Sequence, residues 1–183
     1  MCIRDSLCTG ALYAVEIGTG FRKAEAVLPN GAVLDDRRLR RSSLLWRING
    51  LLIADPSEEQ LRSLVAGRDM AVLKPPRCKN DPVGTLFGTH PIYLPYDPTE
   101  ITNGATWLLR IELRFPCRGP RRAAIPLFFT SASFAPMRHS TVDTILGHFL
   151  RLHLSAERAR AFSFHSFRIG FACCLLAEAS PTT

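Results

Sequence analysis

The pattern of apolar and polar residues predicts a mostly helical chain. Residues 7–17 are apolar with little polar relief, which is typical of a buried helix, and the turn-forming Gly18-Thr19-Gly20 ends it. Apolar side chains also recur at helical spacing between residues 142 and 150, which predicts an amphipathic helix. They are Val142, Ile145, Leu146, Phe149 and Leu150. We expect further helices over residues 21–27, 101–113 and 165–179.

Short apolar runs between turn sequences predict a small antiparallel sheet in the first half of the chain. Residues 44–48 and 51–54 flank Asn49-Gly50, the strongest short-range signal for a hairpin. The other strand candidates are residues 70–73 and 92–96, on either side of a turn-rich segment, 75–88. Between the hairpin and the third strand, Ser57 and Gln60 form a capping box. It predicts the start of a short helix that runs to about Ala66. The expected fold is therefore α+β and mainly α.

The length and composition fit one soluble domain, or one domain and a piece of another. Of the 183 residues, 46% are hydrophobic and 21% are charged, which excludes a wholly disordered chain. No apolar run approaches the roughly 20 residues that span a bilayer, so we expect no membrane partner. The six cysteines show no C-x-x-C pair, so we interpret them as reduced thiols of an intracellular protein and expect no zinc. Cys173 and Cys174 are expected to pack within a helix.

The chain is basic. It has 23 Lys and Arg against 16 Asp and Glu, a net charge of +7 and a pI near 9.5. This surplus suits a polyanionic partner, most simply nucleic acid, although a generally basic soluble protein has the same surplus. Two arginine groups fall in predicted loops, where we expect them to be solvated. They are Arg37, Arg38, Arg40 and Arg41 in the first loop and Arg118, Arg121 and Arg122 in the second.

The motifs of common cofactor sites are missing from the sequence. Gly18-Thr19-Gly20 would need a glycine at position 23 to complete a dinucleotide-binding loop, and Lys23 stands there. No Gly-Lys pair forms a P-loop, and no histidine falls in an H-E-x-x-H pattern. We therefore expect neither a nucleotide cofactor nor a metal ion.

Three separate stretches each place a cationic or proton-transferring side chain beside a tight turn or a helix start. They are residues 19–25, 77–84 and 165–168. In the first stretch, the side chain of Arg22 projects from the first turn of a helix, and Glu25 lies one turn further on the same face. The second carries Lys79 at the tip of a turn, and the third puts His165 and Arg168 on one helix face. Two arginines, a lysine and a histidine that converge would bind a phosphate group, because arginine makes paired hydrogen bonds to its oxygens.

These stretches together resemble the catalytic domain of tyrosine recombinases, the phage-integrase family. The resemblance rests on T-G-x-R-x-x-E at residues 19–25, a lysine in a turn at position 79, and H-x-x-R at residues 165–168, in that order. Residues 73–82 and 164–172 are most similar to the integrases of eukaryotic mobile elements of the DIRS or Crypton type. The resemblance covers nearly the whole chain and implies the fold of DNA breaking–rejoining enzymes.

The resemblance also implies a reaction. In this family a tyrosine attacks a DNA phosphodiester without a metal ion, forms a 3′-phosphotyrosyl link and releases the 5′-hydroxyl. Arg22 and Arg168 match the two arginines that bind the nonbridging oxygens, and Lys79 matches the general acid on the leaving oxygen. His165 matches the histidine that handles the nucleophile's proton or positions the phosphate. Glu25 matches the acidic residue that braces the site.

One departure from the family pattern concerns the nucleophile, which the family places downstream of H-x-x-R. All three tyrosines lie upstream of Arg168, and we interpret them as core or sheet residues. They are Tyr13, Tyr93 and Tyr96. We therefore expect residues 7–183 to be a truncated catalytic domain and residues 1–6 to derive from a sequencing adapter. The fragment would bind double-stranded DNA without cutting it, and the full-length parent would act as a tetramer on paired DNA sites. Its location would be the nucleus if it comes from a eukaryotic mobile element.

Two other functions stay open, a non-catalytic DNA-binding module of the same fold and an enzyme that resembles type IB topoisomerases. Within the site, Lys74 competes with Lys79 for the role of general acid. Glu25 is equally well explained as a charge on a helix surface.

Overall fold

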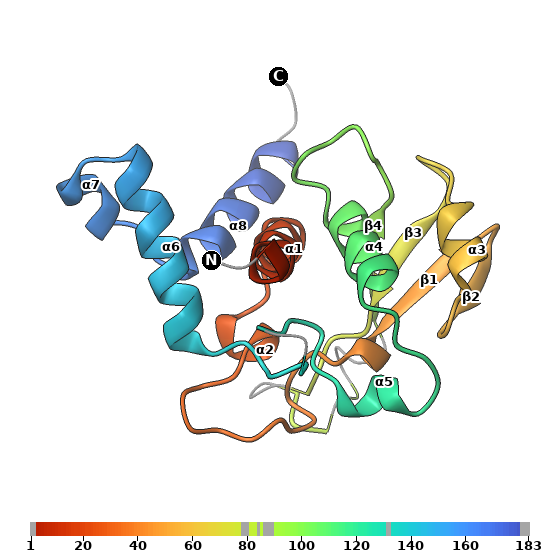
Figure 1. Cartoon of the computed structure of the whole chain (residues 1–183). Helices are drawn as coiled ribbons and strands as arrows, with labels where there is room; N and C mark the ends of the chain where they lie inside the picture. Colours follow the sequence, from red (N-terminus) through yellow and green to blue (C-terminus); the bar gives the residue numbers. More distant parts are fainter. Residues whose placement is uncertain (1–2, 78–80, 84, 86–89, 131–132, 180–183) are drawn as a thin grey trace.

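The described chain folds into a group of helices beside a small antiparallel sheet, which confirms the expected α+β class. The computed structural model describes residues 3–77, 81–83, 85, 90–130 and 133–179. Its helices are α1 (Ile3–Thr19), α2 (Lys23–Ala26), α3 (Glu58–Arg62), α4 (Gly104–Arg114), α5 (Arg121–Ala124), α6 (His139–His153), α7 (Ala156–Arg160) and α8 (His165–Ala179). Its strands are β1 (Leu44–Ile48), β2 (Leu51–Ile53), β3 (Met70–Leu73) and β4 (Ile92–Pro95), and a 3-10 turn, η1 (Arg41–Ser43), precedes β1 (Figure 1).

Helix α1 lies at the centre of the core, as its apolar sequence predicts. Cys8, Leu12 and Val15 are fully buried. Figure 1 shows α1 nearly end-on, with α4 on one side and α6 and α8 on the other. Helix α4 packs closely on α1, because Gly10 leaves room that a larger residue would fill: a Cβ there would lie 2.5 Å from the ring of Trp107.

The sheet has the strand order β2-β1-β3-β4 and is antiparallel throughout. Asn49 and Gly50 both have positive φ angles, 51° and 82°, as a two-residue hairpin turn requires. Trp46 of β1 pairs with Ile53 of β2 and with Ala71 of β3, and its side chain is fully buried. The predicted hairpin is thus confirmed, and the sheet packs beside α4.

Several predicted helices have different bounds in the structure: α1 spans Ile3–Thr19 where residues 7–17 were predicted, and side-chain hydrogen bonds set the starts of α2 and α4. Helix α2 starts at Lys23, since Arg22 before it is extended and donates its N–H to the side chain of Glu25. Helix α4 starts after Asn103, whose side chain accepts the N–H of Thr106. Helix α3 has the predicted capping box but ends at Arg62. Helices α5 and α7 were not predicted.

Two arginines predicted to lie in solvated loops are buried instead. Arg41 is 0% exposed and Arg122 is 3% exposed. Both bind Glu112 of α4: Nη2 of Arg41 lies 2.8 Å from Oε2, and Nη2 of Arg122 lies 2.9 Å from Oε1. Arg41 also donates to the carbonyl of Phe115, and Arg122 donates to that of Leu44. The prediction was wrong because a buried acid on α4, distant in sequence, draws both side chains inward.

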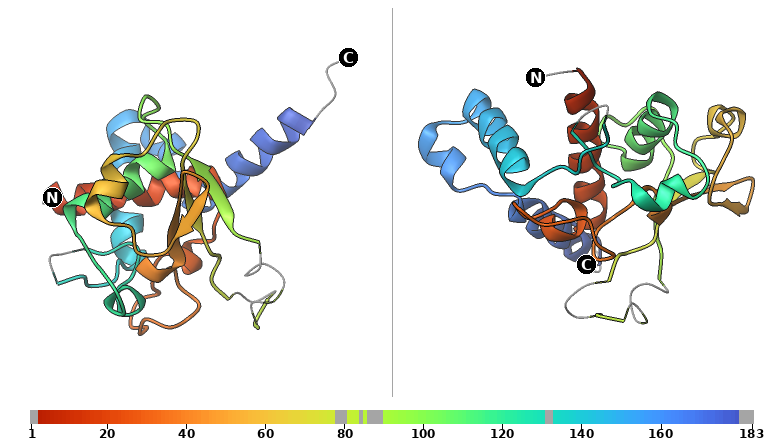
Figure 2. Two further views of the ribbon diagram at one scale, coloured as in Figure 1. Left: turned by 90° about the vertical axis from the view of Figure 1, so that its right-hand side faces the viewer. Right: turned by 60° about the horizontal axis from the view of Figure 1, so that its bottom comes forward.

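The second half of α8 is exposed, and with it Cys173 and Cys174, which were expected to pack inside. Helix α8 meets α1 through its first half, where Phe167 and Phe171 are partly buried. The left view of Figure 2 shows the rest of α8 running away from the body of the molecule. Within the described part of the chain, no helix combines the length and apolar character needed to cross a bilayer.

Candidate phosphate-binding site

The site begins where α1 ends. Gly20 has a φ of 61°, and its N–H donates to the carbonyl of Glu16 at 2.9 Å, a common way to end a helix. A Cβ at Gly20 would lie 2.7 Å from Cδ1 of Phe171, so α8 passes directly over this turn. Glycine is therefore required here both by the backbone angle and by the close approach of α8.

Arg22 follows this turn and is tied to Glu25. The N–H of Arg22 donates to Oε2 of Glu25 at 2.8 Å, which caps α2, and Nη1 of Arg22 lies 3.7 Å from Oε1. The Glu25 side chain is 15% exposed, whereas the Arg22 side chain is 43% exposed. The carboxylate is thus held in place while the guanidinium reaches toward solvent.

An aromatic cluster holds the start of α8 against α1. The ring of Tyr13 lies 5.3 Å from that of Phe167 and 6.3 Å from that of Phe164, centroid to centroid. Phe164 and Phe167 are three residues apart, so they share the side of the chain that packs on α1. His165 and Arg168 are spaced in the same way and share a neighbouring side, which leaves both available to the space beside α2.

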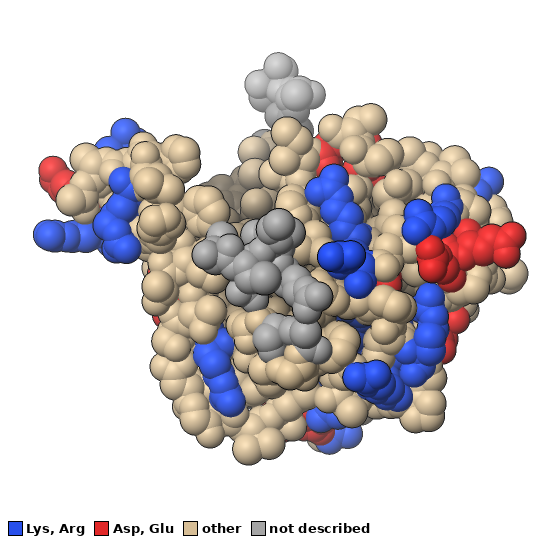
Figure 3. Space-filling model, in the orientation of Figure 1, with Lys and Arg blue, Asp and Glu red and all other residues tan. Residues whose placement is uncertain are grey.

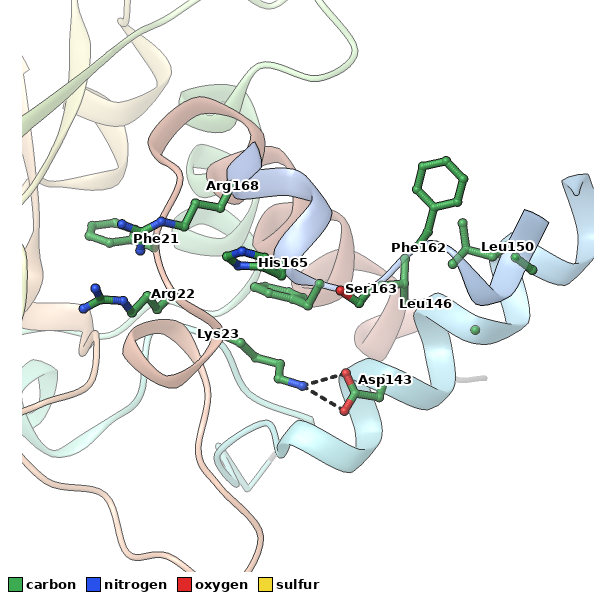
Figure 4. A pocket seen from close by; sticks show the side chains of 13 residues that line it. Phe21, Arg22, Lys23, Asp143, Leu146, Leu150, Phe162, Ser163, His165 and Arg168 are labelled. Carbon is green, nitrogen blue, oxygen red and sulfur yellow. Dashed lines mark hydrogen bonds and ion pairs between the residues drawn. The ribbon is translucent and has the colours of Figure 1, made fainter. Parts of the chain in front are cut away.

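These segments enclose a pocket of about 450 Å³ between α2, α6 and α8 (Figure 4). Arg22, His165 and Arg168 all line it. Figure 4 shows the side chains of Arg22 and Arg168 extending in the same direction, with His165 beside them. The apolar part of the wall consists of Phe21, Leu146, Leu150, Phe162 and Phe164. The pocket therefore has a cationic mouth against an apolar wall.

An ion pair joins α2 to α6 across this pocket. Nζ of Lys23 lies 2.8 Å from both carboxylate oxygens of Asp143, and both residues line the pocket. The hydroxyl of Tyr13 donates to the carbonyl of Val142 at 3.2 Å, which ties the same turn of α6 to α1. Sequence analysis missed the pair because its partners are 120 residues apart and neither belongs to a recognisable motif.

The two predicted site residues of α8 have no competing partner in the described part of the chain. Among the described residues, no hydrogen bond or ion pair holds the side chain of His165 or Arg168. The guanidinium of Arg22 is only loosely held, because 3.7 Å to Glu25 exceeds hydrogen-bond distance. Two guanidinium groups can make paired hydrogen bonds to a tetrahedral oxyanion, and an imidazole can donate or accept a proton. The arrangement suits a phosphate group.

A buried carboxyl that sequence analysis did not single out lies near this cluster. Glu16 is fully buried, and neither of its carboxyl oxygens has a hydrogen-bond partner among the described residues. Burial, with a smaller contribution from Glu25, raises the pKa of Glu16 to about 9, although the charge of Arg168 lowers it. Glu16 is therefore protonated at neutral pH and leaves the charge of Arg168 uncompensated. Its one sequence signal is that it is the single charged residue in the apolar stretch 7–17.

Of the five predicted site residues, three line the pocket and one supports it. Glu25 does not line the pocket but contacts Arg22, which does. Lys79 lies outside the described residues. All three tyrosines belong to the described part of the chain, and none lines the pocket. Burial raises the pKa of Tyr13 above its usual range, and Tyr93 is 51% exposed on β4. In the part of the chain that can be searched, no group of three metal-binding side chains occurs.

Compared with protein-family models, with curated proteins and with solved structures, the chain shows no significant match to any of them. Any function assigned to the pocket therefore depends on its own residues and on the motif resemblance.

Proposed function

We propose that this chain is part of the catalytic domain of a tyrosine recombinase and that its pocket binds the phosphodiester that the enzyme cuts in double-stranded DNA. One observation carries the proposal: Arg22, His165 and Arg168, which come from two distant motifs of that family, line a single pocket. The proposal extends to the fold, which would be that of DNA breaking–rejoining enzymes.

In the proposed reaction, a tyrosine oxygen attacks phosphorus and the bond from phosphorus to the 5′-oxygen breaks. The leaving oxygen takes a proton from Lys79, and the 3′-phosphate stays bound to the tyrosine. Arg22 and Arg168 would hold the nonbridging oxygens, where negative charge increases in the transition state. His165 would position the phosphate or accept the proton of the nucleophile. The phosphotyrosyl bond conserves the energy of the broken phosphodiester bond, so rejoining the DNA strands needs no ATP.

The electrostatics of the pocket support phosphate binding. Lys23 is neutralised by Asp143, and Arg22 is partly neutralised by Glu25. Among the described residues Arg168 has no such partner, and the buried carboxyl on which its charge acts, that of Glu16, is protonated at neutral pH. The strongest uncompensated cation of the pocket is thus Arg168, which the proposal places on the phosphate.

A DNA-binding module without catalysis is the second candidate function, and the tyrosines favour it. The hydroxyl of Tyr13 is bound to the carbonyl of Val142 beneath the pocket wall. Tyr93 and Tyr96 lie on or next to β4, in the sheet. If the protein is an enzyme, we propose that a tyrosine outside these 183 residues is the nucleophile.

The affinity for DNA tests the pocket. We expect the chain to bind a fluorescently labelled duplex with an affinity that falls steeply with salt, because phosphate contacts release counterions. Arg168→Ala should weaken binding about tenfold at 0.1 M salt, as expected for one lost phosphate contact. The matched control is Arg62→Ala, which removes the same charge from an exposed pair with Glu58 on α3. Equal affinities of the Arg168 and Arg62 variants in fluorescence anisotropy would overturn the proposed pocket.

A nicked suicide duplex separates the two candidate functions. We expect no covalent adduct on a denaturing gel from this chain alone, at any incubation time. An adduct that disappears in Tyr13→Phe, Tyr93→Phe or Tyr96→Phe would show that one of these tyrosines is the nucleophile and would overturn our assignment. A longer chain that forms the adduct only when Arg168 is intact would support the recombinase over the binding module.

A further inference from the structure

A second basic pocket lies outside the proposed active site. It has a volume of about 440 Å³ and is formed by the loop before η1, the segment after β3 and the end of α5. Its cationic lining residues are Arg38, Arg40, Lys74 and Arg77. One carboxylate, that of Asp36, and two serines, Ser42 and Ser43, complete its polar lining. It shares no residue with the pocket between α2, α6 and α8.

The segment after β3 presents two of these cations together. Lys74 is fixed at its main chain, since its N–H donates to the carbonyl of Ser43 at 2.9 Å. Pro75 and Pro76 follow, and proline restricts the chain to extended conformations with three residues per turn. Lys74 and Arg77, three residues apart, therefore lie on the same side of this segment, and both line the pocket. The ammonium group of Lys74 is exposed and has no partner among the described residues.

The loop before η1 holds the other two cations in fixed positions. Arg40 donates from Nη1 to the carbonyl of Ala123 at 2.6 Å and from Nε to that of Asp35 at 3.3 Å. The N–H of Leu39 donates to the carbonyl of Glu25, which ties this loop directly to α2. The pocket is thus a built feature of the fold, and the loop that forms it is anchored to the helix that carries the active-site motif.

The charges of this pocket are not balanced. Arg77 lies 3.2 Å from Asp36, and Arg38 lies 3.7 Å from Asp35, so two cations have acidic partners. The other two, Arg40 and Lys74, have no carboxylate within ion-pair distance among the described residues. The pocket keeps an excess of positive charge, which suits a phosphodiester.

The charges of the two pockets act on one common side chain, that of His139. Burial lowers the pKa of His139 at the start of α6, and so do the charges of Lys23 from the first pocket and Arg38 from the second, whereas the charge of Asp143 raises it. In Figure 1, α2, the loop before η1 and the segment after β3 all lie toward the lower end of the molecule, and the right view of Figure 2 brings this end forward. On the face drawn in Figure 3, acidic side chains gather mostly at the right-hand edge, near α3.

We propose that the second pocket binds another phosphate of the same DNA molecule, with Lys74 and Arg77 as its main contacts. This inference rests on the proposed function, because it assumes a duplex already held at the first pocket. Lys74 then acts as a backbone anchor rather than as the general acid. A contact of this kind fixes the register of the duplex without reading its sequence.

The salt dependence of DNA binding tests the inference. In fluorescence anisotropy from 50 to 200 mM salt, Lys74→Ala should weaken binding about five- to tenfold and reduce the slope of log affinity against log salt by about 0.9. Asp36→Asn should have the opposite effect and tighten DNA binding, because it removes the negative charge of the one acidic side chain among the described residues that lines the pocket. Arg62→Ala on α3 should leave both the affinity and the slope unchanged.

The outcomes separate the two proposals. A wild-type chain that binds DNA without salt dependence would overturn the proposed function itself. If Arg168→Ala weakens DNA binding but Lys74→Ala does not, only the proposed second pocket would be overturned. Asp36→Asn checks for a purely structural effect, since a loss of binding in both variants would contradict the electrostatic role. Competition by polyglutamate as strong as that by unlabelled duplex would assign the pocket to an acidic protein segment instead.

Discussion

The same two residue types build two very different regions of this molecule. At the junction of η1, α4 and α5, Arg41 and Arg122 bind one carboxylate, that of Glu112, and all three side chains are almost completely shielded from water. Between α2 and α8, Arg22 and Arg168 face a pocket of about 450 Å³, and no carboxylate of the described residues binds both.

The two regions differ in the charge of the buried carboxyl group that lies near the arginines. Glu112 is buried with both oxygens bound, so it compensates its neighbours. Glu16 is equally buried, but it has no hydrogen-bond partner among the described residues and is protonated at neutral pH, so it does not compensate Arg168. A buried acid that stays charged makes arginines structural, whereas one that is neutral leaves the nearby arginine for a ligand.

The largest effect is expected from Glu112→Gln. Removing this charge leaves Arg41 and Arg122 buried without a counter-charge, which should lower the free energy of unfolding by about 3–5 kcal/mol. The measurement is the midpoint of urea denaturation followed by circular dichroism. Glu58→Gln is the matched control, because Glu58 pairs with Arg62 on the surface of α3, where such pairs contribute under about 0.5 kcal/mol. Similar midpoints for both variants would contradict the distinction between buried and exposed pairs.

Much of the fold could be predicted because its signals are local. The hairpin at Asn49-Gly50 needs only two residues that accept positive φ angles, and the capping box at Ser57 needs only one residue three positions later. The apolar stretch 7–17 identifies the central helix because a run without polar relief has no exposed face. Each of these signals is complete within about ten residues, so the sequence alone is sufficient.

The errors concern contacts between distant residues. Arg41 is 71 residues from Glu112, and no pattern around either residue reveals their ion pair. Cys173 and Cys174 were expected to be buried from the apolar character of α8, but burial depends on which neighbouring element covers the helix. The pocket residues Arg22 and Arg168 could be singled out because each lies beside a tight turn or a helix start and because their motifs resemble a known family, while Glu16 has no motif.

Glu16→Gln tests the other half of the comparison. The folded protein keeps the Glu16 proton up to about pH 9, whereas an unfolded chain loses it near pH 4.5. Stability therefore falls as pH rises between these values, by about 1.4 kcal/mol per pH unit for this group. Glutamine does not titrate, so the variant should gain roughly 2–3 kcal/mol over the wild type between pH 5 and pH 7.

The measurement is the difference in unfolding free energy between wild type and Glu16→Gln at several pH values. The difference removes contributions from groups that titrate equally in both proteins. A difference that stays constant from pH 4 to pH 9 would show that Glu16 is ionised in the folded protein, and Arg168 would then be compensated like the buried arginines.

The smallest effect is expected from Glu25→Gln, the pocket's counterpart of Glu112→Gln. Glutamine can still accept the N–H of Arg22 at the start of α2, so the cap survives, and the ion pair that is lost is long, at 3.7 Å, and partly exposed. Such pairs contribute about 0.2–1 kcal/mol, so the urea midpoint should shift by no more than about a third of the Glu112→Gln shift. A shift comparable to that of Glu112→Gln would mean that Glu25 compensates Arg22 as fully as Glu112 compensates Arg41. The contrast between a structural and a ligand-binding pair of arginines would then fail, because charge compensation would no longer distinguish the two regions.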